Sequence, residues 1–329
     1  MKIAVVILNW NGKKLLEQFL PSVIAHSKTA AIYVADNAST DDSVLFLKST
    51  FPQVNIIRNT INGGFAKGYN DALKNVDADV FCLLNSDVEV TKGWLLPIQQ
   101  TFINNENTAI VQPKLLDFKQ RQFFEYAGAA GGFIDKFGYP YCRGRIFNTL
   151  EEDYGQYNDM QSIFWASGAC LFIRKHVYEA LGGFDESFFA HMEEIDLCWR
   201  AKNLGYDVVY NGNSEVYHVG GATLNNSNPR KTFLNFRNSL FTLVKNAKGN
   251  ILFLVFIRLV LDGIAGLKFL VELKFNHILA IFKAHFSFYA HFYGLLRKRK
   301  TATLKIRYYQ KTSIVWSYFV NRKKHYKSL

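Results

Sequence analysis

Residues 83–90, LLNSDVEV, place two acidic side chains two positions apart, directly after a short apolar run. Apolar runs of this length between polar residues are typical of a strand buried on both faces. Burying an unpaired carboxylate is costly, and a divalent cation with oxygen ligands removes that cost. Asp87 and Glu89 are therefore candidate ligands of Mg²⁺ or Mn²⁺, with a solvated loop as the alternative explanation of the two acids.

Short apolar runs and amphipathic segments alternate on both sides of this motif, across residues 1–112. The runs predict strands at residues 3–8, 32–35, 54–58, 80–84 and 109–112, and the amphipathic segments predict helices at residues 14–25, 41–50, 66–75 and 94–102. Such alternation indicates an α/β fold with a mostly parallel sheet and right-handed crossovers. After a less regular stretch, further elements are expected at residues 169–174, 176–180, 194–203, 208–210 and 216–218.

A polar cluster follows each of the first four expected strands, beginning at Asn9, Asp36, Asn59 and Asn85. Open α/β sheets bind ligands at the carboxyl ends of their strands, so the four clusters are expected to meet at one edge. Asp36 can accept a hydrogen bond there from a pyrimidine N–H, although a turn and a helix N-cap would explain the same segment. The Gly-rich turn at residues 62–64 permits close approach of the backbone to a ligand.

Three acids, Glu193, Glu194 and Asp196, crowd the start of an expected helix within FFAHMEEIDLCWR at residues 188–200. The helix dipole favours acids at this position, which accounts for part of the pattern. An acid in a partly apolar pocket also has a raised proton affinity and can serve as a general base. His218 ends a later strand and is a candidate nitrogen ligand, although a lone histidine is more often structural.

The ordered set of these motifs resembles the family 2 glycosyltransferases with a GT-A fold, particularly the rhamnosyltransferase-like members. The resemblance covers residues 1–240 and rests on VVILNWNG, VADNASTDDS, NGGFAKGYN, LLNSDVEV, ASGACLFIRK, GGFDESFFAHMEEIDLCWR and VYHVGG. It implies a nucleotide-diphospho-sugar transferase fold, with a mostly parallel central sheet flanked by helices. A helical, amphipathic extension is expected to follow at residues 241–329.

The resemblance also assigns residues to the donor side of the site. The residues implied to bind the nucleotide are Asn9, Asp36, Asn62, Gly64 and Asn85. Asp87 matches the metal-binding aspartate of the family's DxD motif, and Glu89 stands in place of its second aspartate. His218 matches a late histidine that is often a metal ligand in the family.

On the acceptor side, the family's ED motif falls on Glu193 and Glu194, so its catalytic aspartate is a glutamate here. We expect Glu194 to be the base, with Asp196 as the reserve candidate. The residues that match a loop lining the acceptor site are Trp165, Ser167 and Gly168.

The implied reaction is an inverting displacement, in which a base activates an acceptor hydroxyl that attacks the anomeric carbon opposite the departing diphosphate. A metal ion and a lysine or arginine would stabilise the leaving group. The implied donor is a dTDP- or UDP-sugar, dTDP-rhamnose among the candidates. The implied acceptor is a glycan or lipid-linked saccharide used in cell-surface polysaccharide synthesis.

The segment after residue 240 changes in composition to aromatic, aliphatic and basic. The chain has 39 Lys and Arg against 27 Asp and Glu, and the excess is concentrated in this segment. No apolar run reaches the roughly 18–20 residues that span a bilayer, so amphipathic helices on an anionic membrane surface are expected. A helical subdomain packed on the catalytic domain, or a homo-oligomer interface, is the alternative.

The four cysteines form no CxxC pair, and the first apolar run is too short for a signal peptide. These features favour the cytoplasm, with attachment to the inner face of the membrane. Two other functions are weighed, a sugar nucleotidyltransferase and a nucleic-acid-binding protein that uses the basic tail. The first lacks its GxGxR-like motif here, and no nucleic acid is expected because the basic residues lie mostly outside the sheet domain.

Overall fold

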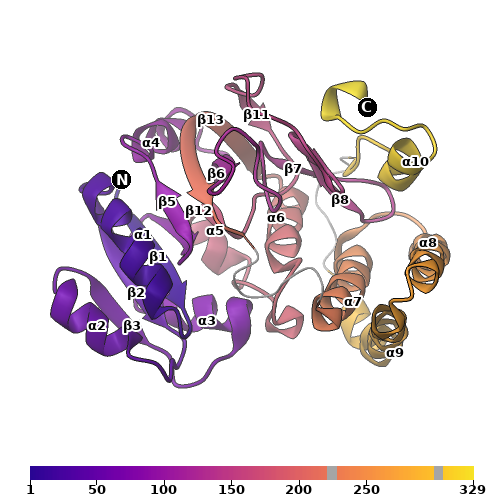
Figure 1. Cartoon of the computed structure of the whole chain (residues 1–329), viewed down its shortest axis with the longest axis horizontal. Helices are drawn as coiled ribbons and strands as arrows, with labels where there is room; N and C mark the ends of the chain where they lie inside the picture. The colour runs from indigo at the N-terminus through magenta and orange to yellow at the C-terminus, as the bar shows by residue number, and fades with distance from the viewer. Residues whose placement is uncertain (221–227, 300–306) are drawn as a thin grey trace.

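The computed structural model describes residues 1–220, 228–299 and 307–329. Its main sheet has the strand order β11-β13-β6-β12-β4-β1-β2-β3, with β5 paired to β13 (Figure 1). The strands of this sheet are β1 (Ile3–Asn9), β2 (Ala30–Asp36), β3 (Asn55–Arg58), β4 (Val80–Asn85), β5 (Val88–Val90), β6 (Thr108–Asp117), β11 (Met160–Ser162), β12 (Cys170–Arg174) and β13 (Asp207–His218).

Four strand pairs of this sheet are parallel and include its three longest, as the alternation of strands and helices predicts. The parallel pairs are β1·β2, β1·β4, β2·β3 and β13·β6. Strand β12 runs antiparallel between β4 and β6. This arrangement brings the carboxyl ends of β1, β2 and β4 together at one edge, because Asn9 pairs with Asp36 and Leu8 pairs with Asn85.

Helices cover both faces of the sheet, and each face has its own apolar core. Alternate residues of β1 point to opposite faces, so Val5 packs with α1 (Lys13–His26), α2 (Ser43–Thr50) and α4 (Leu95–Asn104). Val6 belongs to the other core, which includes residues of α3 (Gly64–Leu73), α5 (Lys175–Ala180) and α6 (Glu193–Asn203). The two cores explain why the buried strands are apolar at nearly every position.

The less regular stretch in the middle of the chain forms a second, smaller antiparallel sheet. Its strands are β7 (Gly132–Ile134), β8 (Pro140–Cys142), β9 (Arg145–Ile146) and β10 (Thr149–Leu150). The sheet lies beside β11 and above α6 in Figure 1. Two short strands expected at residues 208–210 and 216–218 instead form one strand, β13, whose pairing with β6 shifts between Asn211 and Glu215.

The C-terminal segment is helical, as predicted, and it packs against the rest of the molecule. Its helices are α7 (Pro229–Asn246), α8 (Ile251–Val271), α9 (Phe275–Lys298) and α10 (Ile314–Phe319), and a short turn, η2 (Tyr326–Ser328), follows. Leu243, Leu254 and Phe288 share one core with the main sheet. The boundary that we placed at residue 240 falls inside α7, so the tail continues the body of the sheet domain.

A buried polar cluster joins α8 to the small sheet. Arg258 donates through Nε to Asp262 at 2.8 Å, and the Tyr139 hydroxyl donates to the same carboxylate at 3.0 Å. The Nε2 atom of His285, on α9, lies 3.2 Å from the other oxygen of Asp262. Since a buried carboxylate is stable only when it is paired, this cluster fixes the tail helices to the body of the molecule.

Candidate active site

Asn9 and Asp36 end two neighbouring strands, and their side chains are both buried. The amide of Asn9 donates to Asp36 Oδ1 at 3.2 Å, and the backbone N–H of Ser39 donates to Asp36 Oδ2 at 3.1 Å. Asn9 Oδ1 has no hydrogen-bond partner in the described part of the chain, although water and ligands are absent from the structure. The predicted nucleotide residues Asn9 and Asp36 are thus in direct contact at the sheet edge.

Asn62 and Gly64 lie beside them in a hydrogen-bond network whose centre is Asn37. Asn37 was not among the nucleotide-binding residues predicted from the sequence. The buried amide of Asn37 donates to Asn62 Oδ1 at 3.0 Å and to the Gly64 carbonyl at 3.1 Å. Gly64 has φ +78°, and a Cβ there would lie 2.5 Å from the carbonyl oxygen of Phe189. Glycine is required at this position, which holds the turn against the loop that precedes α6.

Asp87 and His218 meet because β5 pairs with β13, in a register that places His218 opposite Val88. The Nε2 atom of His218 lies 3.1 Å from Asp87 Oδ1, and its Nδ1 atom lies 3.2 Å from Glu125 Oε1. All three side chains are buried. Glu125 was not predicted from the sequence, because it lies in the irregular stretch where no periodicity identifies a buried position.

The negative charges of Asp87 and Glu125 set the protonation state of His218. Burial disfavours a charged imidazole, but attraction to Glu125 and the hydrogen bond with Asp87 outweigh it and raise the pKa of His218 to about 10. Without a cation, the ring would carry a proton between the two acids at neutral pH.

Glu89 does not join this group. Its Oε1 atom accepts from the Arg121 guanidinium at 2.7 Å, and the Arg121 guanidinium also lies over the Tyr217 ring. The prediction of Glu89 as a metal ligand is therefore not supported by its contacts, because a cation would have to displace Arg121 from it. Within residues 1–220, 228–299 and 307–329, no group of three or more His, Cys, Asp or Glu is arranged to hold a metal ion.

Asp87 and His218 nevertheless fit a divalent cation as a partial ligand set. A carboxylate oxygen and an imidazole nitrogen suit Mn²⁺, and diphosphate oxygens would complete the coordination. Glu125 lies where a metal-bound histidine usually finds a carboxylate for its second nitrogen. The residues present therefore fit two of the ligand positions of such a cation.

Glu193 and Glu194 lie at the start of α6, and each has one carboxylate oxygen without a hydrogen-bond partner in the described residues. Burial raises the pKa of Glu194 to about 7. The pKa of Glu193 is also raised, by burial and by the neighbouring charge of Glu194. A buried carboxylate with a free oxygen and a pKa near neutrality has the properties of a general base.

Asp196 lies two residues further along α6, and its carboxylate is fully engaged. Its oxygens accept from Arg200 Nε and from the Asn246 amide, both at 2.8 Å, and Lys245 Nζ lies 2.8 Å away. Burial alone would raise its pKa, but attraction to Arg200 and Lys245 lowers it. We therefore withdraw Asp196 as the reserve base, since it stabilises the packing of α6 against α7.

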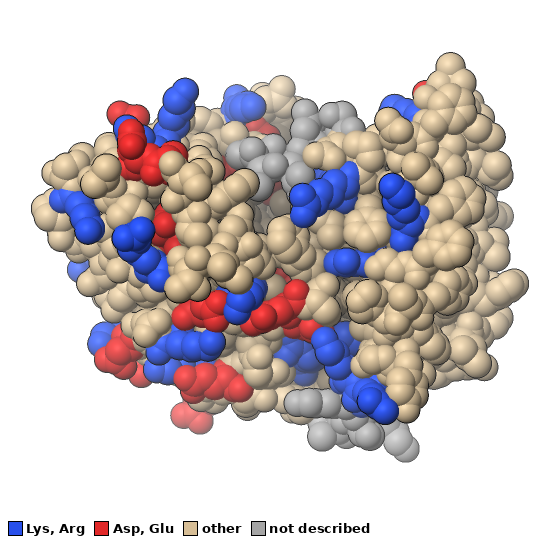
Figure 2. All heavy atoms as spheres, turned by 90° about the horizontal axis from the view of Figure 1, so that it is seen from below, with Lys and Arg blue, Asp and Glu red and all other residues tan. Residues whose placement is uncertain are grey.

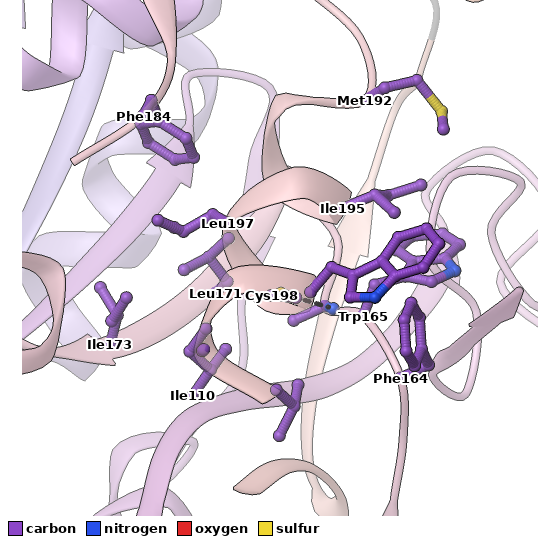
Figure 3. Close-up of a cluster of buried hydrophobic side chains, with 14 of the residues drawn as sticks. Ile110, Phe164, Trp165, Leu171, Ile173, Phe184, Met192, Ile195, Leu197 and Cys198 are labelled. Carbon is purple, nitrogen blue, oxygen red and sulfur yellow. Dashed lines mark hydrogen bonds between the residues drawn. The ribbon is translucent and has the colours of Figure 1, made fainter. Parts of the chain in front are cut away.

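The side chains of Trp165 and Ser167 are buried and do not line an open surface. Trp165 lies in the apolar cluster with Ile195 and Cys198 (Figure 3), and its Nε1 donates to the carbonyl of Phe133 at 2.8 Å. Ser167 Oγ accepts from the backbone N–H of Ala169. Both are withdrawn as acceptor-binding side chains, and Gly168, which faces the Phe65 ring, stays a prediction.

Backbone contacts join the parts of this edge. The N–H of Phe65 donates to the carbonyl of Phe189 at 3.0 Å, which links the Gly64 turn to the loop before α6. The N–H of Asn85 donates to the carbonyl of Ala169 at 2.9 Å. The predicted nucleotide residues and the α6 acids are thus brought to the same part of the molecule by strands and loops far apart in sequence.

Comparison with known structures identifies the fold. GalNAc-T7, solved with UDP, GalNAc and Mn²⁺, superposes with a TM-score of 0.55 at 16% identity, over 66% of this chain and 43% of that one. The mannosyltransferase PcManGT from Pyrobaculum calidifontis, solved with GDP-Man and Mn²⁺, gives a TM-score of 0.52 at 13% identity, over 89% of this chain and 75% of that one. The fold is the GT-A fold of glycosyltransferases.

The family follows from the sequence. The model of glycosyl transferase family 2 matches residues 4–182. An N-acetylglucosaminyl-diphospho-decaprenol L-rhamnosyltransferase of Mycobacterium tuberculosis is 24% identical over 66% of this chain and 75% of that protein. The low-salt glycan biosynthesis hexosyltransferase Agl10 of Haloferax volcanii is 23% identical over 61% of each. The chain belongs to glycosyl transferase family 2, and it is a glycosyltransferase that uses a nucleotide-sugar donor.

Proposed function

We propose that the protein is an inverting, metal-dependent enzyme that moves a sugar from a dTDP- or UDP-sugar to a hydroxyl of a glycan or lipid-linked acceptor. The resemblance to a rhamnosyltransferase for a lipid-linked saccharide favours dTDP-rhamnose among the donors and synthesis of a cell-surface polysaccharide as the setting. The observation that carries the proposal is the contrast between two acids. Asp87 is buried and paired with His218, whereas Glu194 is half-buried, and its buried Oε2 has no hydrogen-bond partner among the residues that the structure describes.

In the proposed reaction, Glu194 accepts the proton of the acceptor hydroxyl as the hydroxyl oxygen attacks the anomeric carbon. The bond from that carbon to the diphosphate breaks on the opposite face, and the nucleoside diphosphate leaves with the bonding electrons. A carboxylate with a pKa near 7 takes up this proton readily at neutral pH. The remaining barrier is lowered mainly by positioning the two substrates.

Asp87 and His218 would hold the cation, and the nucleotide would lie over Asn9, Asp36, Asn62, Gly64 and Asn85. The cation would supply positive charge to the departing diphosphate. Glu125 would keep the His218 ring oriented so that Nε2 faces the cation.

A donor screen tests the proposal. The purified protein is incubated with Mn²⁺ and a panel of dTDP-, UDP- and GDP-sugars, and release of each nucleoside diphosphate is measured with and without lipid-linked saccharides. We expect one dTDP- or UDP-sugar to be turned over in a reaction that a chelator abolishes. Turnover that persists in the chelator, or turnover of a GDP-sugar alone, would contradict the proposal.

We also propose that helices α8 and α9 lie on the anionic inner face of the cell membrane. Each exposes a row of apolar side chains at helical spacing, which on α9 consists of Phe275, Leu279, Phe282, Phe286, Tyr289, Tyr293 and Leu296. Figure 2 shows the right-hand part of this face as mostly uncharged, with Lys and Arg gathered along its inner border. No described helix is long and apolar enough to cross a membrane.

The charge of the tail favours a membrane over a second copy of the chain as the partner of this surface. Residues 251–329 contain 15 Lys and Arg but only two acids, Asp262 and Glu272. Two such surfaces would repel each other, whereas anionic lipids attract basic residues and accept exposed aromatic ones. The four cysteines are free and buried, which suits the reducing side of that membrane.

A further inference from the structure

The loop that leads into α6 has a strained backbone. Three of its four residues, Phe189, His191 and Met192, have φ values between 65° and 72°, a region that costs a residue with a side chain about 1 kcal/mol or more. At Phe189 the chain makes a tight γ-turn, in which the N–H of Ala190 donates to the carbonyl of Phe188 at 2.8 Å. Such a run persists only where the surrounding structure holds it.

Helix α7 supplies the groups that hold this loop. The side-chain amide of Asn238, which is fully buried, donates to the carbonyls of Phe188 at 3.0 Å, Ala190 at 2.9 Å and His191 at 2.8 Å. Its neighbour Arg237 donates from one guanidinium nitrogen to the carbonyls of Ser187 and Phe188. Four of the five carbonyls from Ser187 to His191 therefore accept from two adjacent side chains of α7.

The remaining carbonyl, that of Phe189, faces the opposite direction. It accepts from the N–H of Phe65, one residue after the Gly64 turn. The loop is consequently held between α7 and the predicted nucleotide-binding turn. A change in its path would displace the first residues of α6, Glu193 and Glu194, relative to that turn.

We infer that Asn238 and Arg237 are positioning residues. By fixing the backbone of residues 187–191, they hold Glu194, the base of the reaction, in its catalytic position. This inference rests on the proposed function, because it takes Glu194 as the base. Neither side chain needs to contact the substrate. Their contribution lies in fixing a backbone that would otherwise relax, and a displacement of about 1 Å at a reacting group can cost roughly 100-fold in rate.

Two variants test the inference. Asn238→Asp keeps the shape of the side chain but removes its hydrogen-bond donors, and Arg237→Met keeps an unbranched apolar stem without the guanidinium. Thr242→Val is the matched control, since Thr242 is also buried on α7 but donates only to the Asn238 carbonyl of the same helix. We expect kcat to fall about 10- to 100-fold in the first two, with donor KM and Mn²⁺-dependent nucleotide affinity within about twofold of wild type.

A second measurement does not depend on activity. Hydrogen exchange of the peptide that spans residues 186–196 should be faster in both test variants and unchanged in Thr242→Val. Wild-type kcat together with wild-type exchange in Asn238→Asp and Arg237→Met would overturn the inference. If the wild-type protein transfers no sugar, or Glu194→Gln transfers normally, the proposed function fails instead, and the exchange result still reports whether α7 holds the loop.

Discussion

Two acids on one turn of α6 show how local surroundings decide what a carboxylate does. Asp196 is paired with two cations and an amide, so it is held ionised and structural. Glu194 is half-buried with its Oε2 fully covered, but it has no cationic partner in the described residues, and that oxygen has no hydrogen-bond partner among them. Burial without a partner raises the proton affinity of an acid, which is the property that a general base needs.

The first prediction concerns the base itself. Glu194→Gln should lower kcat about 10²- to 10⁴-fold, because the amide cannot accept the hydroxyl proton. Donor binding should be preserved, since the group acts on the acceptor. Initial rates and calorimetric titration with nucleoside diphosphate and Mn²⁺ check both parts. Glu179→Gln, on the exposed surface of α5, is the control, and normal transfer by Glu194→Gln would remove Glu194 from the mechanism.

The second prediction concerns pH. The pKa of Glu194 is raised from 4.5 to about 7 on folding, so the transfer rate should rise as pH increases through 7. Between pH 4.5 and about pH 7, the folded state keeps a proton on Glu194 that the unfolded state has lost. The raised pKa therefore lowers the free energy of unfolding as pH rises through this range. Glu194→Gln should therefore be more stable than wild type by about 1–3 kcal/mol at pH 8 but not at pH 4.5. Urea denaturation at both pH values measures this, and equal stability at pH 8 would contradict it.

The third prediction separates Glu125 from Glu89. Glu125→Gln should weaken Mn²⁺ binding about 10- to 100-fold, because His218 would lose the carboxylate beside its second nitrogen. Glu89→Gln should bind Mn²⁺ as wild type does, because Glu89 is paired with Arg121. Calorimetric titration with Mn²⁺ and UDP distinguishes the two. If Glu89→Gln weakened Mn²⁺ binding and Glu125→Gln did not, Glu89 would again be the candidate for the second carboxylate ligand.

At the scale of elements, most strands and helices of the sheet domain were predictable because each carries its own apolar period. Strand β4 was predicted at residues 80–84 and lies at Val80–Asn85. Glu125 was not predictable, since the loop that carries it has no period and reaches His218 only through tertiary contacts. The burial of Trp165 was missed for a similar reason, because its core forms between segments distant in sequence.

The fourth prediction concerns the contact between α6 and α7. Asp196→Ala should destabilise the protein by about 3–5 kcal/mol, because Lys245 and Arg200 would lose a buried partner. The midpoint of urea denaturation at pH 7 measures the loss. Asp71→Ala is the control, since its pairs with Lys67 and Lys74 lie on the surface of α3 and should contribute about 1 kcal/mol or less. A similar change in both variants would contradict the buried role of Asp196.

For the whole molecule, the predicted tail of residues 241–329 is helical but is not a separate appendage. Leu240 and Leu243 of α7 belong to the same core as the sheet, and Arg299, at the end of α9, donates to the carbonyls of Val244 and Ala247. The composition indicated where the sequence becomes aromatic, aliphatic and basic. It could not show that α7 crosses this boundary, because the contacts that bury α7 come from distant segments.

The fifth prediction concerns the membrane. Wild-type protein should float with vesicles that contain anionic lipid, and binding should weaken as salt rises, because basic residues contribute to it. The double variant Phe282→Ser and Phe286→Ser should lose most of this binding while it keeps activity on a soluble acceptor, since both rings are exposed on α9. Leu45→Ser, an exposed change on α2, is the control. Full binding by the double variant would rule out this face of α9.

The pairing of β5 with β13 limits where β13 can gain or lose a residue. His218 lies opposite Val88, so backbone hydrogen bonds set its distance from Asp87. Side chains alternate along a strand, and one residue inserted after Glu215 would turn the imidazole to the opposite face. The same insertion near Asn213 would only enlarge the irregularity already present between Asn211 and Glu215. We therefore expect an insertion in the middle of this strand to be better tolerated than one after Glu215, which would remove His218 from Asp87.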